Sequence, residues 1–338
     1  MVTEVVRLPL KRSGKISGLF LELIGRKALF EAWTVKSEPL RGGLLARYDL
    51  VWASPIRSYA LWLRLRSMLG IEANRVVAAI NDSYALTLME LSKRKGTAFE
   101  RLGYRCRASA MRGIEKRLLA KADIVGVQSK REIDFFRADF PVGQRPELVE
   151  LKNGVAPNLF RARDAVVYDL LFVGSLDGFY RPTLDWFLRE VYSKMEIPRP
   201  SFVIVGAGAT VEDVKKFSEF SIEYFPFVED IYHFYLTSKI LVAPVFKGYG
   251  TINKVIEGMA AGCVVVGDRT AFNGLENFVP NRDALVAESS SDFLVAIMAI
   301  LADSVRADVI GANARKLMRE DFSWNSRLDI VLSRLELS

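Results

Sequence analysis

The sequence is poor in the residues that build disulfides and metal clusters. Its 338 residues include two cysteines and one histidine. Cys106 and Cys263 lie far apart, and neither belongs to a Cys-x-x-Cys or Cys/His cluster, which argues against a disulfide framework and a structural zinc. His233 has no partners with which to build a metal site. We therefore expect a reducing compartment and no metal site.

Long apolar runs are also missing. No stretch of about 18 apolar residues occurs, and the charged start of the chain is not followed by the apolar core of a signal peptide. The chain is nevertheless 50% hydrophobic, and it is longer than one hydrophobic core usually organises. These features predict two globular domains in a cytoplasmic protein that does not span a membrane.

Positive charge is concentrated in the first half of the chain. Residues 1–160 hold 28 Lys and Arg against 16 Asp and Glu, and the remainder holds 19 against 24. The formal net charge of +7 therefore belongs to the first half. A basic half favours an anionic partner, such as a membrane surface, a phosphorylated lipid or a nucleic acid, although a solvated basic face gives the same count.

The second half alternates short apolar runs with amphipathic segments of helical length. This pattern predicts strand-helix-strand units and a parallel sheet. The predicted strands cover 170–173, 202–205, 240–243 and 263–266, and the predicted helices cover 182–193, 210–219, 251–261, 291–302, 306–319 and 323–335.

The first half follows the same pattern less regularly. Its predicted strands cover 49–53, 76–80 and 123–127. A long basic helix is predicted over 97–121, and its cations could meet phosphate head groups or simply face solvent. These cations are Arg101, Arg105, Arg112, Lys116 and Arg117.

A turn-rich segment at 152–157 marks the boundary between the halves. We expect an acceptor-side domain over 1–154 and a donor-binding domain over 155–338. The last helix of the chain could pack back on the first domain.

A glycine-rich segment between a predicted strand and a predicted helix carries the clearest chemical signal. Gly248 and Gly250 follow the strand 240–245, and Lys254 and Glu257 lie in the helix that comes next. Glycines let the backbone approach a diphosphate, and a helix N-terminus contributes unpaired N–H groups and partial positive charge. The cation suits phosphate, and the acid one turn later suits ribose hydroxyls. The segment predicts a site for a nucleotide diphosphate.

The same spacing has a plainer interpretation. Residues three apart share one helix face, so Lys254 and Glu257 could form an ordinary ion pair on a solvated helix. Short glycine-rich patterns also occur by chance. Spacing alone leaves both interpretations open.

The motifs of the second half occur in a specific order. They are Phe172-Val173-Gly174-Ser175 with Arg181-Pro182, then 203–208, 228–231, the glycine-rich segment up to Glu257, 271–275 and Phe322-Ser323-Trp324. From residue 170 to about 334, this order resembles the retaining glycosyltransferases of the GT-B fold, in particular family 4 (glycosyl transferases group 1). The resemblance implies an α/β fold of two Rossmann-like, doubly wound domains facing a cleft.

The resemblance also implies roles for individual residues. Lys254 would bind the donor diphosphate and Glu257 the ribose, and both would serve catalysis. The further donor-binding positions would be Gly174, Ser175, Arg181, Gly206, Val228, Gly250, Thr251 and Asn253.

The chain departs from the family pattern in three places. Tyr249 stands where the Glu-x7-Glu motif has its first acid, as in a subgroup that reads Gly-x-Gly-x-x-x-Lys-x-x-Glu. The usual Arg and Lys after the first strand are not clearly present, and Arg181 is the candidate substitute. The segment 1–8 lacks the glycine-rich turn with which members normally open. Either the N-terminal domain is abbreviated, or the acceptor side is built differently.

Asp82 is the candidate for contact with the acceptor. It follows the predicted strand 76–80, where related proteins often carry an Asp facing the cleft. It could orient an acceptor hydroxyl or act as its base, or it could merely cap a helix over 84–92. The catalytic histidine of some relatives has no counterpart, because His233 falls within the helix after Val228.

The resemblance implies a retaining hexosyltransferase, and because no Asp-x-Asp metal site is visible we expect it to be independent of metal. It would move a sugar from a nucleotide-diphosphate sugar to a hydroxyl of a glycan, a polysaccharide or a lipid-linked acceptor. The nucleotide sugar is a substrate, so we expect no cofactor. We expect no nucleic-acid partner, and an anionic membrane surface, met from the cytoplasmic side, is the further candidate partner.

Three other classes of protein stay open. A GT-B relative that has lost catalysis and serves as a binding or scaffold subunit would explain the missing first acid. A sugar-nucleotide epimerase would need an acid/His set that is not apparent. A nicotinamide dehydrogenase would need a third glycine after 205–208 and an acid about 20 residues further on.

Overall fold

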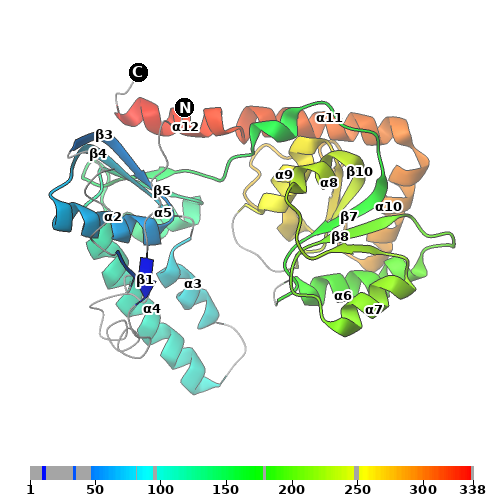
Figure 1. Ribbon diagram of the computed structural model, residues 1–338, viewed down its shortest axis with the longest axis horizontal. Coiled ribbons are helices and arrows are strands. Elements are labelled where there is room, and N and C mark those ends of the chain that lie inside the picture. Colours follow the sequence, from blue (N-terminus) through cyan, green and yellow to red (C-terminus); the bar gives the residue numbers. More distant parts are fainter. Residues whose placement is uncertain are drawn as a thin grey trace. The chain divides into compact units, whose positions relative to one another are not determined.

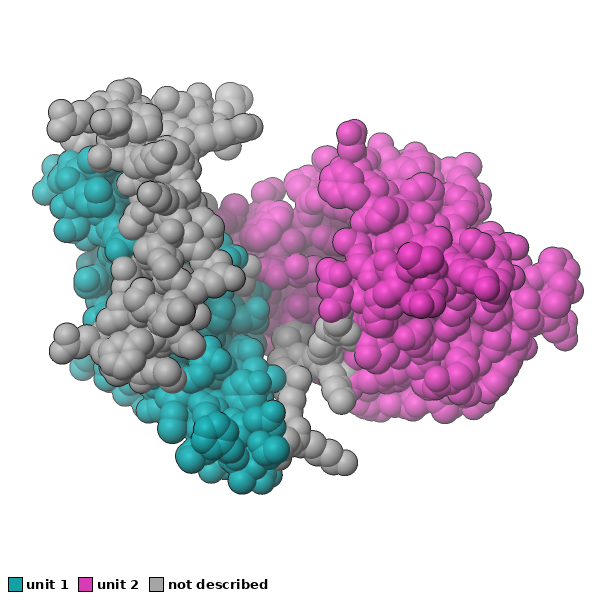
Figure 2. Space-filling model, turned by 60° about the horizontal axis from the view of Figure 1, so that its bottom comes forward, with its two compact units in different colours: residues 1–151, 335–337 teal, residues 152–334, 338 magenta. Residues whose placement is uncertain are grey.

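The computed structural model describes residues 10–12, 33–35, 47–80, 82–93, 97–177, 180–246 and 251–335. The chain divides into two units, Met1–Leu151 with Leu335–Leu337, and Lys152–Arg334 with Ser338 (Figure 2). The predicted boundary after residue 154 lies a few residues beyond this division. Among the described residues, no helix is long and apolar enough to cross a bilayer.

The second unit is built on a six-stranded parallel sheet with the strand order β12-β11-β10-β7-β8-β9 (Figure 1). Its strands are β7 Tyr168–Val173, β8 Phe202–Val205, β9 Glu223–Phe225, β10 Ser238–Ala243, β11 Val264–Gly267 and β12 Leu285–Val286. Its helices are α6 Arg181–Glu190, α7 Val211–Glu219, α8 Ile231–Thr237, α9 Asn253–Ala261, α10 Ser290–Ala302, α11 Ser304–Asp321 and α12 Trp324–Leu332. Short 3-10 turns cover Pro157–Phe160, Tyr192–Lys194, Arg269–Phe272 and Ser333–Leu335.

This sheet is covered by helices on both faces, which explains the near-continuous apolar runs of its strands. Leu170 and Leu171 are neighbours on β7, yet they belong to different apolar clusters because successive side chains of a strand point to opposite faces. One cluster packs under α8 and α9, and the other packs under α6 and α10. Each fully buried Leu or Phe contributes about 1.5–3 kcal/mol to folding.

Side chains fix where several helices begin. The side chains of Thr97, Thr210 and Ser289 each accept a hydrogen bond from the backbone N–H three residues on. The acid at that third position accepts in turn from the backbone N–H of the capping residue. Such reciprocal capping satisfies N–H groups that would otherwise have no partner. The helix α9 is different, because no side chain caps it at Ile252.

The first unit carries a four-stranded parallel sheet with the order β3-β4-β5-β6. Its elements are β3 Arg47–Ala53, α2 Ile56–Leu69, β4 Glu72–Ala79, α3 Tyr84–Leu91, α4 Ala98–Leu119, β5 Ile124–Val127, α5 Lys130–Arg137 and β6 Glu147–Glu150. A separate antiparallel pair joins β1 Leu10–Arg12 to β2 Trp33–Val35. The predicted departure over 1–8 lies outside the described residues.

The structure confirms the predicted alternation of strands and helices in both halves. Every predicted strand is present within a few residues of its expected bounds, and the basic helix over 97–121 is α4. The edge strands β6, β9 and β12 were not predicted. They are two to four residues long, so their apolar runs are too short to distinguish from loops.

Candidate functional site

The start of α9 lies at the carboxyl edge of the sheet, after β10, and carries the predicted phosphate-binding residue Lys254. Gly248 and Gly250 lie outside the described residues. From Thr251 onward, the chain enters α9, whose first turn is Asn253 to Ile256 and has no side-chain cap. Backbone N–H groups at such a helix start lack partners within the helix and favour an anion.

Lys254 is buried in the first turn of α9, with 6% of its surface exposed. Among the residues that the structure describes, its Nζ has no hydrogen-bond partner. It lies 3.7 Å from the ring centre of Tyr180 and 4.5 Å from that of Phe172. Burial lowers the pKa of the Lys254 ammonium to about 7, against a smaller opposing attraction from Asp268. A buried cation without an acceptor is costly to the fold, so this residue is suited to meet an anionic ligand.

Glu257 lies one turn further along α9 and does not pair with Lys254. Its Oε2 accepts a hydrogen bond of 2.9 Å from the buried Tyr235 hydroxyl on α8. Burial raises the pKa of the Glu257 carboxyl, against the lowering effect of that hydrogen bond. The alternative of a solvated Lys254–Glu257 ion pair is therefore wrong, because the lysine side chain turns into the protein interior.

Two glycine loops meet at the same edge of the sheet. Gly206, after β8, has a φ of 154°, and a Cβ on it would lie 2.1 Å from the carbonyl oxygen of Gly174, after β7. The amide of Gly174 donates to Val205 at 3.0 Å, and the amide of Leu176 donates to Ala207 at 2.6 Å. Glycine at 206 is therefore required for the loops to approach each other.

Known proteins resemble this chain both in sequence and in fold. Residues 167–303 match the family model described as Glycosyl transferases group 1. This match lies within the second unit, and the chain has the GT-B fold. A search of curated proteins finds no match.

Several solved structures share the GT-B fold of this chain. Sucrose-phosphate synthase from Thermosynechococcus elongatus is 18% identical with a TM-score of 0.58, over 86% of this chain and 74% of that one. Anabaena HepE in complex with UDP and glucose is 14% identical with a TM-score of 0.60, over 85% and 77%. A glycosyltransferase from Rickettsia africae ESF-5 is 15% identical with a TM-score of 0.51, over 86% and 97%.

Arg181 of the second unit holds loops together. Its Nε donates to the carbonyl of Leu176 at 3.0 Å, and one terminal nitrogen donates to the carbonyl of Gly208 at 2.6 Å. The other terminal nitrogen pairs with Asp213 on α7. These partners favour an architectural role, and contact with a phosphate stays a prediction for Arg181.

The other predicted positions surround the start of α9 or the neighbouring strand ends. Thr251 has a buried Oγ1 without a hydrogen-bond partner. Asn253 is exposed, and its Oδ1 accepts from Asn153 at 2.7 Å. Ser175 donates to Asp177 at 3.1 Å. Val228 is partly buried against the core. Their roles in binding stay predictions.

Asp82 belongs to the first unit, three residues after the end of β4 at Ala79. Its side chain is exposed, yet partial desolvation raises the pKa of its carboxyl. The N-cap of α3 is Ser83, whose Oγ accepts from the amide of Leu86 at 3.1 Å. The capping alternative for Asp82 is therefore wrong, and its role toward an acceptor stays a prediction. His233 lies on α8, as predicted.

Sequence reasoning missed three residues that shape the site. Tyr180 and Phe172 provide the rings against Lys254. Asp268, which follows β11, accepts from the amides of Val245 at 2.6 Å and Phe246 at 3.2 Å, and so fixes the start of the loop toward α9. Its position at the carboxyl end of a buried strand was the available signal.

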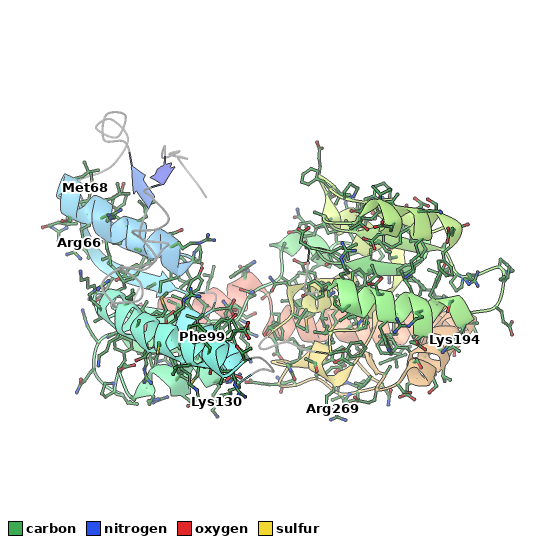
Figure 3. The ribbon with its side chains drawn as sticks, turned by 90° about the horizontal axis from the view of Figure 1, so that it is seen from below. Arg66, Met68, Phe99, Lys130, Lys194 and Arg269 are labelled. Atoms are coloured by element: carbon green, nitrogen blue, oxygen red, sulfur yellow. The ribbon has the colours of Figure 1, made fainter. Side chains whose placement is uncertain are left out.

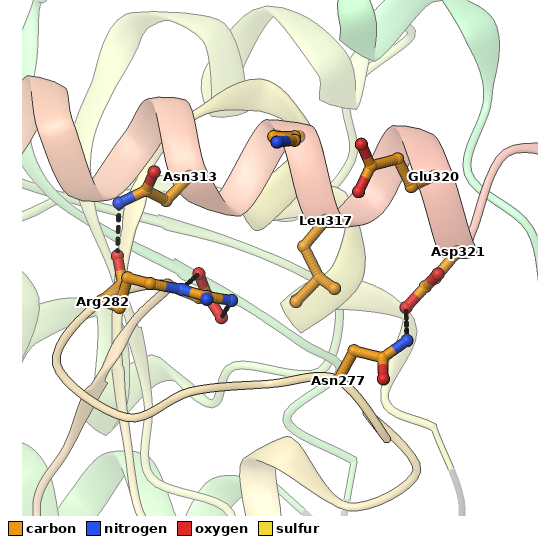
Figure 4. Close-up of a pocket in the computed structure, with 8 residues that line it drawn as sticks. Asn277, Arg282, Asn313, Leu317, Glu320 and Asp321 are labelled. Carbon is orange, nitrogen blue, oxygen red and sulfur yellow. Dashed lines mark hydrogen bonds and ion pairs between the residues drawn. The ribbon is translucent and has the colours of Figure 1, made fainter.

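The second unit also has a polar pocket of about 290 Å³ beside α11 (Figure 4). Asn313 donates to the carbonyl of Arg282, and Asn277 donates to Asp321. Arg282 makes a two-point contact with the buried Asp283 at 2.8 and 2.9 Å. The lining charges largely neutralise one another, and none of the predicted site residues lines this pocket.

Proposed function

We propose that this protein is a glycosyltransferase whose nucleotide-diphosphate sugar binds in the second unit at the start of α9. The observation that carries the proposal is Lys254 in the first turn of that helix, a buried cation for which the described residues provide no acceptor. A diphosphate would supply the missing acceptors, and the uncapped N–H groups of α9 would add to its binding.

The chemistry follows from the charge that develops on the leaving diphosphate. When the bond between sugar and diphosphate breaks, negative charge accumulates on the phosphate oxygens, and a fixed cation and oriented N–H groups stabilise it. Lys254 would fill the first role without a metal ion. The loops at Gly174 and Gly206 would let the backbone approach the nucleotide. Glu257 would accept hydrogen bonds from the ribose hydroxyls.

We propose that the donor is a sugar linked to uridine diphosphate. Support comes from similar structures, since Anabaena HepE was solved with UDP and with UDP-glucose. We further propose retention at the anomeric carbon, as in family 4, with an acceptor hydroxyl on a glycan or a lipid-linked acceptor. Asp82 is our candidate to orient that hydroxyl.

We also propose that the first unit works at an anionic membrane surface. Arg112 and Lys116 pair with Asp139 at 2.8 and 3.2 Å, so the free basic face of α4 is narrower than its sequence suggests. Its first turns keep Arg101 and Arg105 exposed, and Phe99 in the same turns is 85% exposed (Figure 3). A helix end with both exposed cations and an exposed aromatic ring suits the interface of a bilayer.

The test is calorimetric titration with UDP, GDP, ADP and CMP, followed by a transfer assay with the nucleotide sugar that binds. We expect UDP to bind the wild type and Lys254→Ala to weaken it at least about 100-fold, the scale of a lost charge-assisted contact in a buried site. Lys215→Ala, an exposed lysine on α7, is the matched control and should bind as wild type. Binding of none of the nucleotides overturns the donor site. Binding without transfer to any acceptor favours the scaffold alternative.

A further inference from the structure

Tyr180 and Phe172 enclose the amino group of Lys254. The ring centre of Tyr180 is 3.7 Å from Nζ, the ring centre of Phe172 is 4.5 Å away, and the two rings meet edge to face at 82°. The Nζ atom is buried and has no acceptor in the part of the chain that the structure describes. The faces of aromatic rings attract an ammonium, but they offer it no hydrogen-bond acceptor.

The backbone around Tyr180 holds this ring in place. The carbonyl of Tyr180 accepts from the amide of Leu184 at 3.0 Å and from Thr183 Oγ1 at 2.8 Å, at the start of α6. The next residue, Arg181, is tied to the glycine loops described above. A Cβ at Gly174 would lie 2.8 Å from the Tyr180 ring, so the absence of a side chain there gives the ring its place.

The charged and titratable groups around Lys254 are few. Asp268, after β11, is the carboxylate whose attraction acts on the ammonium. Glu257 lies on the same helix but is bonded to Tyr235 of α8. Burial outweighs the attraction of Asp268 and lowers the pKa of Lys254 to about 7. Near neutral pH, the site is therefore divided between the amine and the ammonium.

We infer that Tyr180 is a positioning residue that seals Lys254 from water, so that a donor diphosphate binds together with one proton. This inference rests on the proposed donor site. The lone pair of the Lys254 amine takes the proton from water or buffer, and no covalent bond to the phosphate forms. The resulting ammonium exchanges its ring contacts for phosphate oxygens. A lysine open to water would already carry its proton and would show no such linkage.

The experiment measures proton uptake when UDP binds, by calorimetry in two buffers of different ionisation enthalpy. We expect the wild type to take up about half a proton near pH 7 and about one near pH 8.5, with affinity falling about tenfold for each pH unit above 7. Tyr180→Ala admits water, so its uptake near pH 8.5 falls close to zero. Tyr180→Phe keeps the ring and the linkage. Lys254→Ala reports the titration of the nucleotide itself.

A second measurement follows the lysines without nucleotide, by NMR of side chains labelled at Cε. We expect one lysine to titrate near pH 7 in the wild type, to be missing in Lys254→Ala, and to titrate at least about two pH units higher in Tyr180→Ala. Equal titration in wild type and Tyr180→Ala overturns the inference, as does UDP binding without proton uptake by the wild type. If UDP fails to bind, the proposed function fails, and the NMR titration still decides the role of Tyr180.

Discussion

The two units treat buried charge in opposite ways. In the first unit, the carboxylate of Glu115 on α4 is fully buried and accepts from the hydroxyl of Ser83 at 2.8 Å and from the amide of Tyr84 at 2.7 Å. Glu132 on α5 accepts from the amides of Ser83 at 2.8 Å and Gln128 at 3.0 Å. In the second unit, Lys254 is also buried, but its Nζ donates to no acceptor among the described residues.

This difference distinguishes a structural role from a binding role. Glu115 and Glu132 accept hydrogen bonds from the turn between β4 and α3, so these acids stabilise the loop that carries Asp82. Among the described residues, two aromatic rings and the attraction of Asp268 oppose the desolvation of Lys254, and burial still outweighs them. Since an unsatisfied buried charge destabilises a fold, its presence is best explained by a ligand that completes it.

The largest expected effect is a loss of stability in the first unit, where the buried acids have hydrogen-bond partners. Glu115→Ala leaves the hydroxyl of Ser83 and the amide of Tyr84 without acceptors, which should destabilise the protein by about 4 kcal/mol. Chemical denaturation measures this loss. Glu115→Gln keeps the shape of the side chain and one acceptor and should cost clearly less. An equal loss in both variants would mean that the fold requires both carboxylate oxygens and that shape and one acceptor are not enough.

Glu115 also gives this region a pH dependence. Burial raises the pKa of its carboxyl from 4.5 to about 7, so the folded protein binds the proton more tightly than the unfolded chain. The stabilisation that comes from this tighter proton binding is fully present below about pH 4.5 and is lost as the pH rises through about 7. Glu115→Gln should remove this part of the pH profile.

Lys254→Met should act in the opposite direction and stabilise the second unit. Between pH 7 and 10.5 the unfolded lysine holds a proton that the folded one has lost, so the penalty on folding is largest below pH 7 and vanishes above 10.5. Removing the charge should therefore raise the free energy of unfolding near pH 7 by on the order of 3 kcal/mol. A loss of stability in Lys254→Met would show that the lysine is a satisfied structural residue.

Gly206→Ala should cost about 2 kcal/mol or more and should also weaken UDP binding. The new Cβ would collide with the carbonyl of Gly174, and residue 206 has a φ of 154°, which a residue with a side chain rarely adopts. Gly113→Ala on α4 is the matched control, because a Cβ there meets no atom within 4 Å. That change should stabilise the helix slightly, by about 0.5–1 kcal/mol. Thermal unfolding of both variants makes the comparison.

Glu257→Gln has the smallest expected effect. The amide oxygen can still accept from the Tyr235 hydroxyl, but the charge that would face the ribose is lost. We expect UDP to bind about tenfold more weakly, the size of one charge-assisted hydrogen bond. Pyrophosphate has no ribose, so its affinity should not change. Equal weakening of both ligands would assign Glu257 to the phosphates instead.

Much of the fold could be predicted from the sequence because its strands are buried on both faces. The runs that became β7, β8, β10 and β11 are apolar throughout, which is the pattern of a covered parallel sheet. The predicted order of motifs in the second half also led to the GT-B fold. Periodicity gave no comparable signal for the short edge strands.

The state of the site residues could not be predicted in the same way. The spacing of Lys254 and Glu257 is the same for a solvated ion pair as for a buried cation and a separate acid. What decides between them is Tyr180, 74 positions before Lys254, and Tyr235 on another helix. The helical spacing of α4 likewise predicted a basic face, but Asp139 comes from a separate segment and neutralises part of it.

We propose above all that a nucleotide diphosphate supplies the hydrogen-bond acceptors for the ammonium of Lys254. The most direct measurement is the unfolding of the second unit in wild type and Lys254→Met, each with and without UDP at about 100 times the wild-type dissociation constant. The wild type should gain about 2.7 kcal/mol from UDP, and Lys254→Met should gain almost nothing while starting from higher stability. An equal gain in both proteins would contradict the account, because the nucleotide would then bind without the buried lysine.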